Sequence, residues 1–170
     1  MEVPMMRQAL SVVLGVLVLG ISSAGAQIWT FDAVLSADQE VPPSGSPATG
    51  RATGTYDQST RVLRIMVNAS GFESNLLFGH IHLGARGQNG PVVFYLMNRS
   101  NDPRVWTSDD TFTLTAAQEA DFLGWRYYVN LHTQTYPAGA IRGQLEPVPE
   151  PASLLALSAG LLVYLRRRSR

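Results

Sequence analysis

The stretch that decides the fold lies in the middle of the chain and reads Val62-Leu63-Arg64-Ile65-Met66-Val67-Asn68-Ala69-Ser70. Apolar residues stand at every second position, Leu63, Ile65, Val67 and Ala69, with Arg64, Met66 and Asn68 between them. Successive side chains of a β-strand point to opposite faces of its sheet. The alternation therefore predicts a strand with one face in a core and the other toward solvent.

Similar strand signals occur on both sides of this stretch. They cover residues 28–35, 50–57, 78–83, 92–98, 110–114, 127–133 and 140–145. Clusters rich in Gly, Pro, Asn, Asp and Ser separate them, as turns between strands require. One helix is expected, because Thr115 to Gln118 has the form of a capping box and Gly124 ends the helix-forming run at Leu123. The pattern predicts an all-β fold, an antiparallel sandwich or barrel of about eight strands with one short helix.

Composition excludes several classes of function. The chain has 170 residues, 13 Lys and Arg against 13 Asp and Glu, and no cysteine. Without cysteine there is no disulfide framework, no thiolate zinc site and no cysteine nucleophile. Because the charges balance and the arginines are dispersed, a basic groove is not expected, and neither is a nucleic-acid partner.

Residues 1–26 have the features of a secretory signal peptide. Arg7 precedes an apolar run over residues 9–21, which is too short to cross a bilayer easily. Ala24 and Ala26 supply small residues at the two positions that a signal peptidase reads. Signal peptidase is therefore an expected partner, and cleavage after Ala26 would make Gln27 the mature N-terminus.

A second address is expected at the other end, in residues 148–170. Pro149, Glu150 and Pro151 come first, an apolar run over residues 152–165 follows, and an arginine cluster ends the sequence. As a helix the apolar run would reach about 21 Å, short of the ~30 Å hydrocarbon core, and the arginines would stay on the cytoplasmic side. The pattern predicts a short C-terminal transmembrane helix.

This three-part tail resembles the PEP-CTERM protein-sorting signal. The resemblance implies that a membrane transpeptidase of the exosortase type cuts the tail, so that anchoring in the inner membrane is transient. It also implies a Gram-negative host that makes extracellular polysaccharide, and a final location at the cell surface or outside the cell. The β domain between the two addresses is expected to span residues 27–147.

Three histidines, His80, His82 and His132, are the whole imidazole inventory of the chain. His80 and His82 are two positions apart in an expected strand, so both rings project from the same face. If the strand that holds His132 is a neighbour, three imidazoles converge, and they would suit copper or zinc. The alternative is that the histidines are structural, hydrogen-bonded residues that pack the Gly-rich loop 84–90.

The sequence offers little support for an enzyme. Ser, His and Asp are present, but the Gly-x-Ser-x-Gly motif of serine hydrolases is not. Asp109 and Asp110 read as the solvated start of a strand, and Glu40 stands beside a proline turn. There is no phosphate-binding loop and no dinucleotide fingerprint, so no catalytic residue is assigned.

Several blocks in the middle of the chain resemble the CHRD (chordin) domain. The blocks are FDAVLS (31–36), QEVPP (39–43), GHIHLG (79–84), GQNGPVV (87–93), YVNLHT (128–133) and YPAGAIRGQL (136–145). One departure is Ala140, where the family often has an acidic residue. The resemblance implies an immunoglobulin-like β fold and an extracellular module for which no enzymatic activity is established.

Two interpretations remain open. The leading one is a secreted, non-enzymatic surface or extracellular-matrix protein without a cofactor, whose binding module contacts extracellular polysaccharide or a surface protein. The alternative is a mononuclear copper- or zinc-binding protein that uses His80, His82 and His132.

Overall fold

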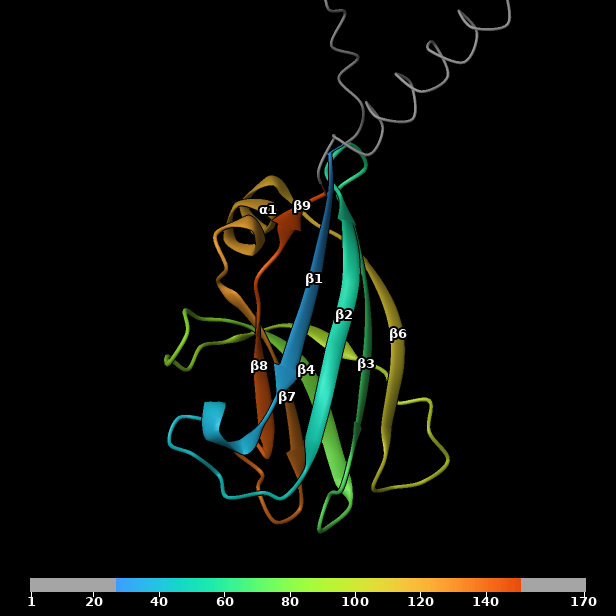
Figure 1. Cartoon of the computed structure of the whole chain (residues 1–170), viewed down its shortest axis with the longest axis vertical. Coiled ribbons are helices and arrows are strands. Elements are labelled where there is room, and N and C mark those ends of the chain that lie inside the picture. The colour runs from blue at the N-terminus through green and yellow to red at the C-terminus, as the bar shows by residue number, and fades with distance from the viewer. Residues whose placement is uncertain (1–26, 151–170) are drawn as a thin grey trace, which may run out of the picture.

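The computed structural model describes residues 27–150, which form two antiparallel sheets packed face to face (Figure 1). The first sheet has the order β6-β3-β2-β1-β9 and the second β5-β4-β7-β8. The strands of the first sheet are β1 (Ile28–Leu35), β2 (Thr49–Asp57), β3 (Val62–Ser70), β6 (Trp106–Thr113) and β9 (Val148–Pro149). Those of the second are β4 (Leu76–Leu83), β5 (Val92–Leu96), β7 (Tyr127–Thr133) and β8 (Ile141–Leu145). A 3-10 helix, η1 (Ala37–Gln39), and an α-helix, α1 (Ala116–Leu123), complete the described elements.

The predicted all-β sandwich with one short α-helix is confirmed, and β3 shows why. Leu63, Ile65 and Val67 of this strand are fully buried, whereas the residues between them are exposed. The strand lies between β2 and β6, and its inward face meets the second sheet. The two sheets approach closely at Gly79, where a Cβ atom would lie 2.4 Å from the Trp106 ring.

Helix α1 closes one end of the sandwich (Figure 1). Its capping box forms as expected, because Thr115 accepts from the Gln118 backbone and the Gln118 side chain accepts from the Thr115 backbone. Phe122 is fully buried and packs edge-on against Phe31 and Tyr56, at centroid distances of 5.8 and 5.3 Å. The helix therefore plugs the core through one aromatic side chain.

Two strands of the second sheet, β7 and β8, are buried on both faces, which is the feature that positions the site. Every residue of β7 and β8 is buried, although alternate side chains point away from the core. Three loops, 36–46, 84–91 and 134–139, fold over this outer face. The Arg142 side chain of β8 donates to the Gln88 carbonyl at 3.0 Å, which ties loop 84–91 to the sheet. The Asn89 side chain donates to the Val41 carbonyl at 2.8 Å, which joins two of the loops to each other. The outer face is therefore a covered polar layer rather than a solvated surface.

Two details differ from the sequence-based expectations. Asp110 is not a solvated strand start: it lies within β6, is 7% exposed, and accepts from the Met97 backbone N–H at 3.2 Å. The first sheet also continues past the expected domain boundary at residue 147, because β9 pairs with β1. The pairing of so short a segment with a distant strand has no signal in local sequence.

Several predicted features lie outside the described residues. These are the signal peptide with Ala24 and Ala26, Pro151 of the sorting signal, the apolar run 152–165 and the arginine cluster. Within residues 27–150, no helix is long and apolar enough to cross a membrane.

We expect Phe122→Ala to lower the free energy of unfolding of the domain by about 3–5 kcal/mol, because it leaves a cavity among aromatic rings that cannot collapse. Urea denaturation of the purified domain measures this loss. Leu123→Ala, a change at the partly buried neighbour, is the matched control and should cost clearly less. Equal losses in the two variants would show that Phe122 does not anchor the helix.

Candidate metal centre

The structure brings together all three histidines of the chain. Each offers one ring nitrogen, and these three atoms lie within 4.8 Å of one another. His80 and His82 come from β4 and His132 from β7, and their side chains are only 7–8% exposed. The convergence of the three imidazoles depended on the condition that the two strands are neighbours, and β4 does pair with β7.

Strand register explains the convergence. In the antiparallel β4–β7 pair, Phe78 lies opposite His132 and His80 lies opposite Asn130. His132 is therefore the diagonal neighbour of His80 on the same outer face, a separation that ring side chains can bridge. The ring centroids of His80 and His132 are 5.0 Å apart, and that of His82 lies 5.4 Å from His80.

Backbone carbonyls orient two of the rings. His82 Nδ1 lies 2.9 Å from the Gly90 carbonyl oxygen, and His132 Nδ1 lies 3.1 Å from that of Pro137. A carbonyl only accepts, so each Nδ1 must carry the proton and each Nε2 keeps its lone pair. Metal-binding histidines are commonly oriented by such a second hydrogen bond. Within residues 27–150, His82 Nε2 is one of several buried side-chain atoms that have no hydrogen-bond partner, and its lone pair is an acceptor for a cation.

The spacing of the other two rings also fits a metal. His80 Nδ1 and His132 Nε2 are 3.3 Å apart. Two nitrogens bound to one tetrahedral zinc ion at about 2.0–2.1 Å would be about 3.3 Å apart. When no ion is bound, the same two atoms can share a hydrogen bond if His80 carries its proton on Nδ1.

Electrostatics keep the three rings neutral. Burial lowers the pKa of His80 and of His82, and it lowers the pKa of His132 to about 4. The neighbouring imidazoles act in the same direction on His80 and His132, since each disfavours a second positive charge nearby. Neutral imidazole is the form that binds a metal ion, so no proton has to leave at neutral pH.

Aromatic rings border the cluster on two sides. On the buried side, His82 stacks on Tyr128 at 5.0 Å and 10°, and the Arg142 guanidinium lies 3.6 Å from the centre of the Tyr128 ring. On the other side, Phe78 and Tyr95 flank His80 and are 55% and 71% exposed. Access to the cluster from solvent therefore lies beside His80.

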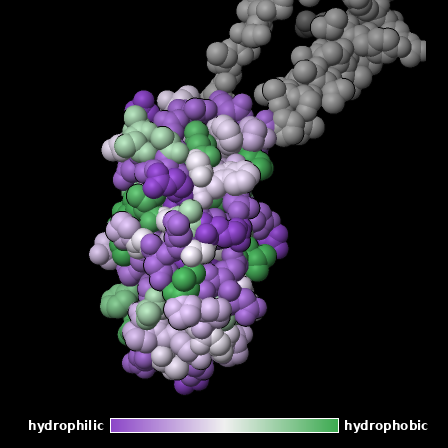
Figure 2. Space-filling model, turned by 90° about the vertical axis from the view of Figure 1, so that its left-hand side faces the viewer, coloured by the Kyte–Doolittle hydropathy of each residue, from purple (hydrophilic) through white to green (hydrophobic). Residues whose placement is uncertain are grey.

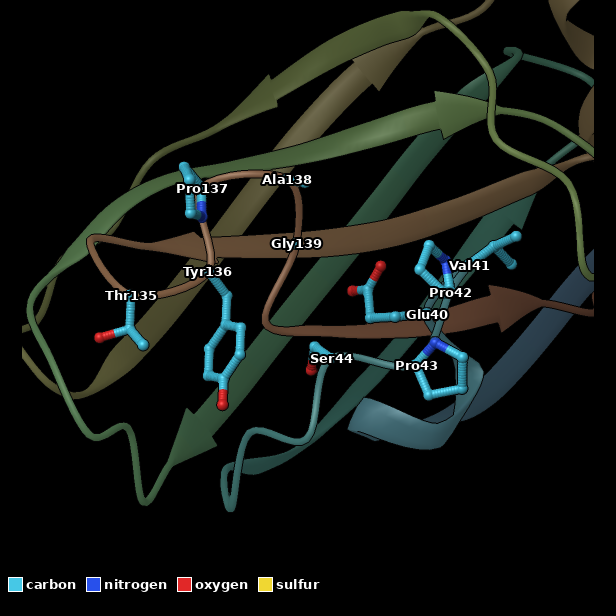
Figure 3. A pocket seen from close by; sticks show the side chains of 10 residues that line it. All are labelled: Glu40, Val41, Pro42, Pro43, Ser44, Thr135, Tyr136, Pro137, Ala138 and Gly139. Atoms are coloured by element: carbon cyan, nitrogen blue, oxygen red, sulfur yellow. The ribbon is translucent and has the colours of Figure 1, made fainter.

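A buried carboxyl group that no local sequence pattern predicts lies on the same covered face. Glu40 is 6% exposed, and its Oε2 accepts from Asn130 Nδ2 at 3.4 Å. Burial raises the pKa of Glu40 to about 7, although Arg142 opposes the shift. Figure 3 shows Glu40 beside Gly139 in the wall of a shallow pocket of about 290 Å³ between the loops that contain Pro42 and Pro137.

Sequence reasoning missed Glu40, Asn130, Tyr128 and Arg142 as members of this layer. A signal existed for two of them, because Tyr128 and Asn130 stand at every second position before His132 and so share its face. Glu40 and Arg142 reach the layer only through loop closure and the pairing of β8 with β7. Such long-range contacts leave no local pattern.

The raised pKa of Glu40 predicts a pH dependence of stability. Between its ordinary pKa of 4.5 and about 7, the folded domain binds this proton more tightly than the unfolded chain, so stability falls as pH rises through this window. Glu40→Gln keeps an acceptor for Asn130 and removes the titration. We expect the variant to gain up to about 3 kcal/mol over the natural domain between about pH 5 and pH 8, measured by urea denaturation. Parallel pH profiles would contradict the assignment.

Family models match most of the chain. The CHRD domain model matches residues 31–145, a range that contains all three histidines, and the PEP-CTERM protein-sorting motif matches residues 147–169. No curated protein matches the chain. The sequence resemblances are therefore confirmed, and the chain belongs to the CHRD domain family and ends in a PEP-CTERM sorting motif.

Proposed function

We propose that this secreted, exosortase-targeted protein is a non-enzymatic surface or matrix protein whose CHRD domain holds a single copper or zinc ion. His80, His82 and His132 would be the ligands. The observation that carries the proposal is the convergence of three neutral imidazoles, two of them oriented by the Gly90 and Pro137 carbonyls.

A purely structural role explains these contacts less well. In that interpretation His82 Nε2 stays buried without a partner, and an unsatisfied buried polar atom destabilises a fold. An ion bound between the rings would satisfy this atom together with one nitrogen from each of His80 and His132. Imidazole suits copper and zinc, and three protein ligands leave one coordination position for water or another small ligand.

The location of the protein supports a role at the cell surface. The PEP-CTERM motif directs export and processing by exosortase-type machinery. Signal peptidase would release Gln27 as the N-terminus, and the C-terminal helix would hold the chain in the inner membrane until the tail is cut. Extracellular polysaccharide or a surface protein would then bind the exposed loops. Figure 2 shows the side of the domain with α1 and the long loops, where hydrophobic residues form separate patches among hydrophilic ones.

Metal binding predicts a large gain in thermal stability. The purified domain, residues 27–150, should bind one equivalent of copper or zinc. At a hundredfold excess of free metal over Kd, the ion should stabilise the fold by about 2.7 kcal/mol, which corresponds to a rise in Tm of about 10 °C. Calorimetric titration and thermal unfolding with each ion measure the two effects.

The matched variants for this experiment are His82→Asn and Thr111→Ala. The asparagine Nδ2 occupies the place of His82 Nδ1 and can still donate to the Gly90 carbonyl, but asparagine offers no imidazole nitrogen, so the metal-induced rise in Tm should disappear. Thr111 is exposed on β6 of the other sheet, and its replacement should leave the rise unchanged. An unchanged Tm of the natural domain with both ions would eliminate the metal proposal.

The sorting motif predicts the fate of a tail variant. Replacing Pro149, Glu150 and Pro151 by alanine should leave a full-length species in the inner membrane, because the transpeptidase no longer recognises the tail. Immunoblots of membrane and extracellular fractions measure this. Alanines at Gln58, Ser59 and Thr60, an exposed turn at the same end of the domain, form the control. Normal processing of the tail variant would show that these three residues are not read.

A further inference from the structure

The first residues of the sorting motif are part of the folded domain. Strand β9 pairs antiparallel with β1, with Val148 opposite Thr30 and Pro149 opposite Trp29. The Glu150 backbone N–H continues the ladder and donates to the Ile28 carbonyl at 2.9 Å. Two residues of the motif's Pro-Glu-Pro sequence, Pro149 and Glu150, are therefore held at the edge of the first sheet.

Proline is well placed in this strand. The N–H of Glu150 points inward to β1, so the backbone nitrogen of Pro149 points to the free edge, where its missing hydrogen costs no ladder bond. A proline on the free edge also hinders the addition of another strand. A partner that binds this segment as an extended strand must therefore compete with β1.

An unusual tryptophan fixes the chain just before β9. Trp125 has a φ of 60°, in the left-handed region that residues other than glycine rarely adopt. Its ring is half-exposed, and its Nε1 donates to the Pro147 carbonyl at 3.1 Å. Trp125 and Val148 line the same shallow depression on the surface. The left-handed φ belongs to the end of α1, where the Trp125 N–H donates to the Phe122 carbonyl and the next N–H to the Asp121 carbonyl, as in a Schellman motif. The helix end therefore holds the Trp125 ring against the segment that precedes β9.

We infer that β9 and Trp125 form a latch that withholds the sorting motif from the transpeptidase while the domain is closed. In the closed state the Glu150 N–H is bonded to β1, so an enzyme that binds the backbone around Pro149 and Glu150 must first displace this segment from the sheet. The strand is short and its side chains are exposed, so it can open locally while the core stays folded. The rate of tail processing then depends on the fraction of open molecules. This inference is independent of the metal proposal, because the histidines lie in the other sheet.

A reversible covalent lock tests the latch. Thr30 and Val148 lie directly opposite each other in an antiparallel pair, so their Cα atoms are within disulfide reach. The natural chain has no cysteine that could compete with an engineered pair. In the oxidising periplasm, Thr30→Cys with Val148→Cys should join β1 to β9. Pulse-labelling in the native bacterium should show tail processing slowed at least about tenfold, and a reductant should restore the natural rate.

The matched control joins Thr30 to its neighbour on the other side. Thr30→Cys with Thr55→Cys locks β1 to β2 and leaves β9 free, so its tail should be processed at the natural rate. Processing of the β1–β9 lock at the natural rate would overturn the latch, since the enzyme would then accept the docked strand. Equal slowing of both locked variants would also overturn it, because the effect would not depend on β9.

A second variant opens the latch. Trp125→Gly places at this position a residue that adopts a φ of 60° easily. It also removes the indole that donates a hydrogen bond to the Pro147 carbonyl. Loss of one hydrogen bond should raise the open fraction, and with it the processing rate, about two- to tenfold. Far-UV circular dichroism of the purified domain checks that the fold is intact. A folded variant with an unchanged or slower rate would contradict the latch.

Discussion

The site depends on one constraint, which is that the outer face of β7 and β8, together with His80 and His82 of β4, is buried although it carries polar side chains. Buried polar atoms need partners, and carbonyls of the covering loops supply several of them. Arg142 lies against Tyr128 and donates to the Gln88 carbonyl, and Gln144 donates to the carbonyls of Gly84 and Trp125. The loops that supply these carbonyls are held in place by the same bonds, so the cover and the polar layer stabilise each other.

This constraint also determines the tautomer and the charge of the histidines. Because His82 and His132 point their Nδ1 atoms at carbonyls in two different loops, their Nε2 atoms are left for other partners, and that of His132 lies 3.3 Å from His80 Nδ1. Burial then disfavours the charged rings, so the cluster presents unprotonated nitrogens. The geometry that suits a metal thus arises from the way the loops are attached to the sheet.

Sequence periodicity predicted most of the sandwich because the core-facing alternation is local. Residues 62–70 and 127–133 were predicted with the bounds that the structure has, and the capping box placed α1. The histidine pair was also readable, since an i, i+2 spacing fixes one face of a strand. Glu40 and β9 could not be predicted, because burial of the first and pairing of the second depend on contacts about a hundred residues apart. Local sequence patterns do not indicate which distant segments will come into contact.

The strand order shows how an ion could stabilise this exported domain, which has no disulfides. The ligands come from β4 and β7, strands that are already paired, so an ion between them would close no new long loop and would add little chain-entropy stabilisation. Its contribution would come from satisfying buried nitrogens and from fixing the rings that hold loops 84–91 and 134–139. The rings of His82 and His132 are hydrogen-bonded to the Gly90 and Pro137 carbonyls of these two loops. An ion bound to the rings would therefore stabilise the loops that cover the sheet more than the core. We therefore expect the core, with Phe122 and the alternating strands, to fold without metal and the loops to gain order when metal binds.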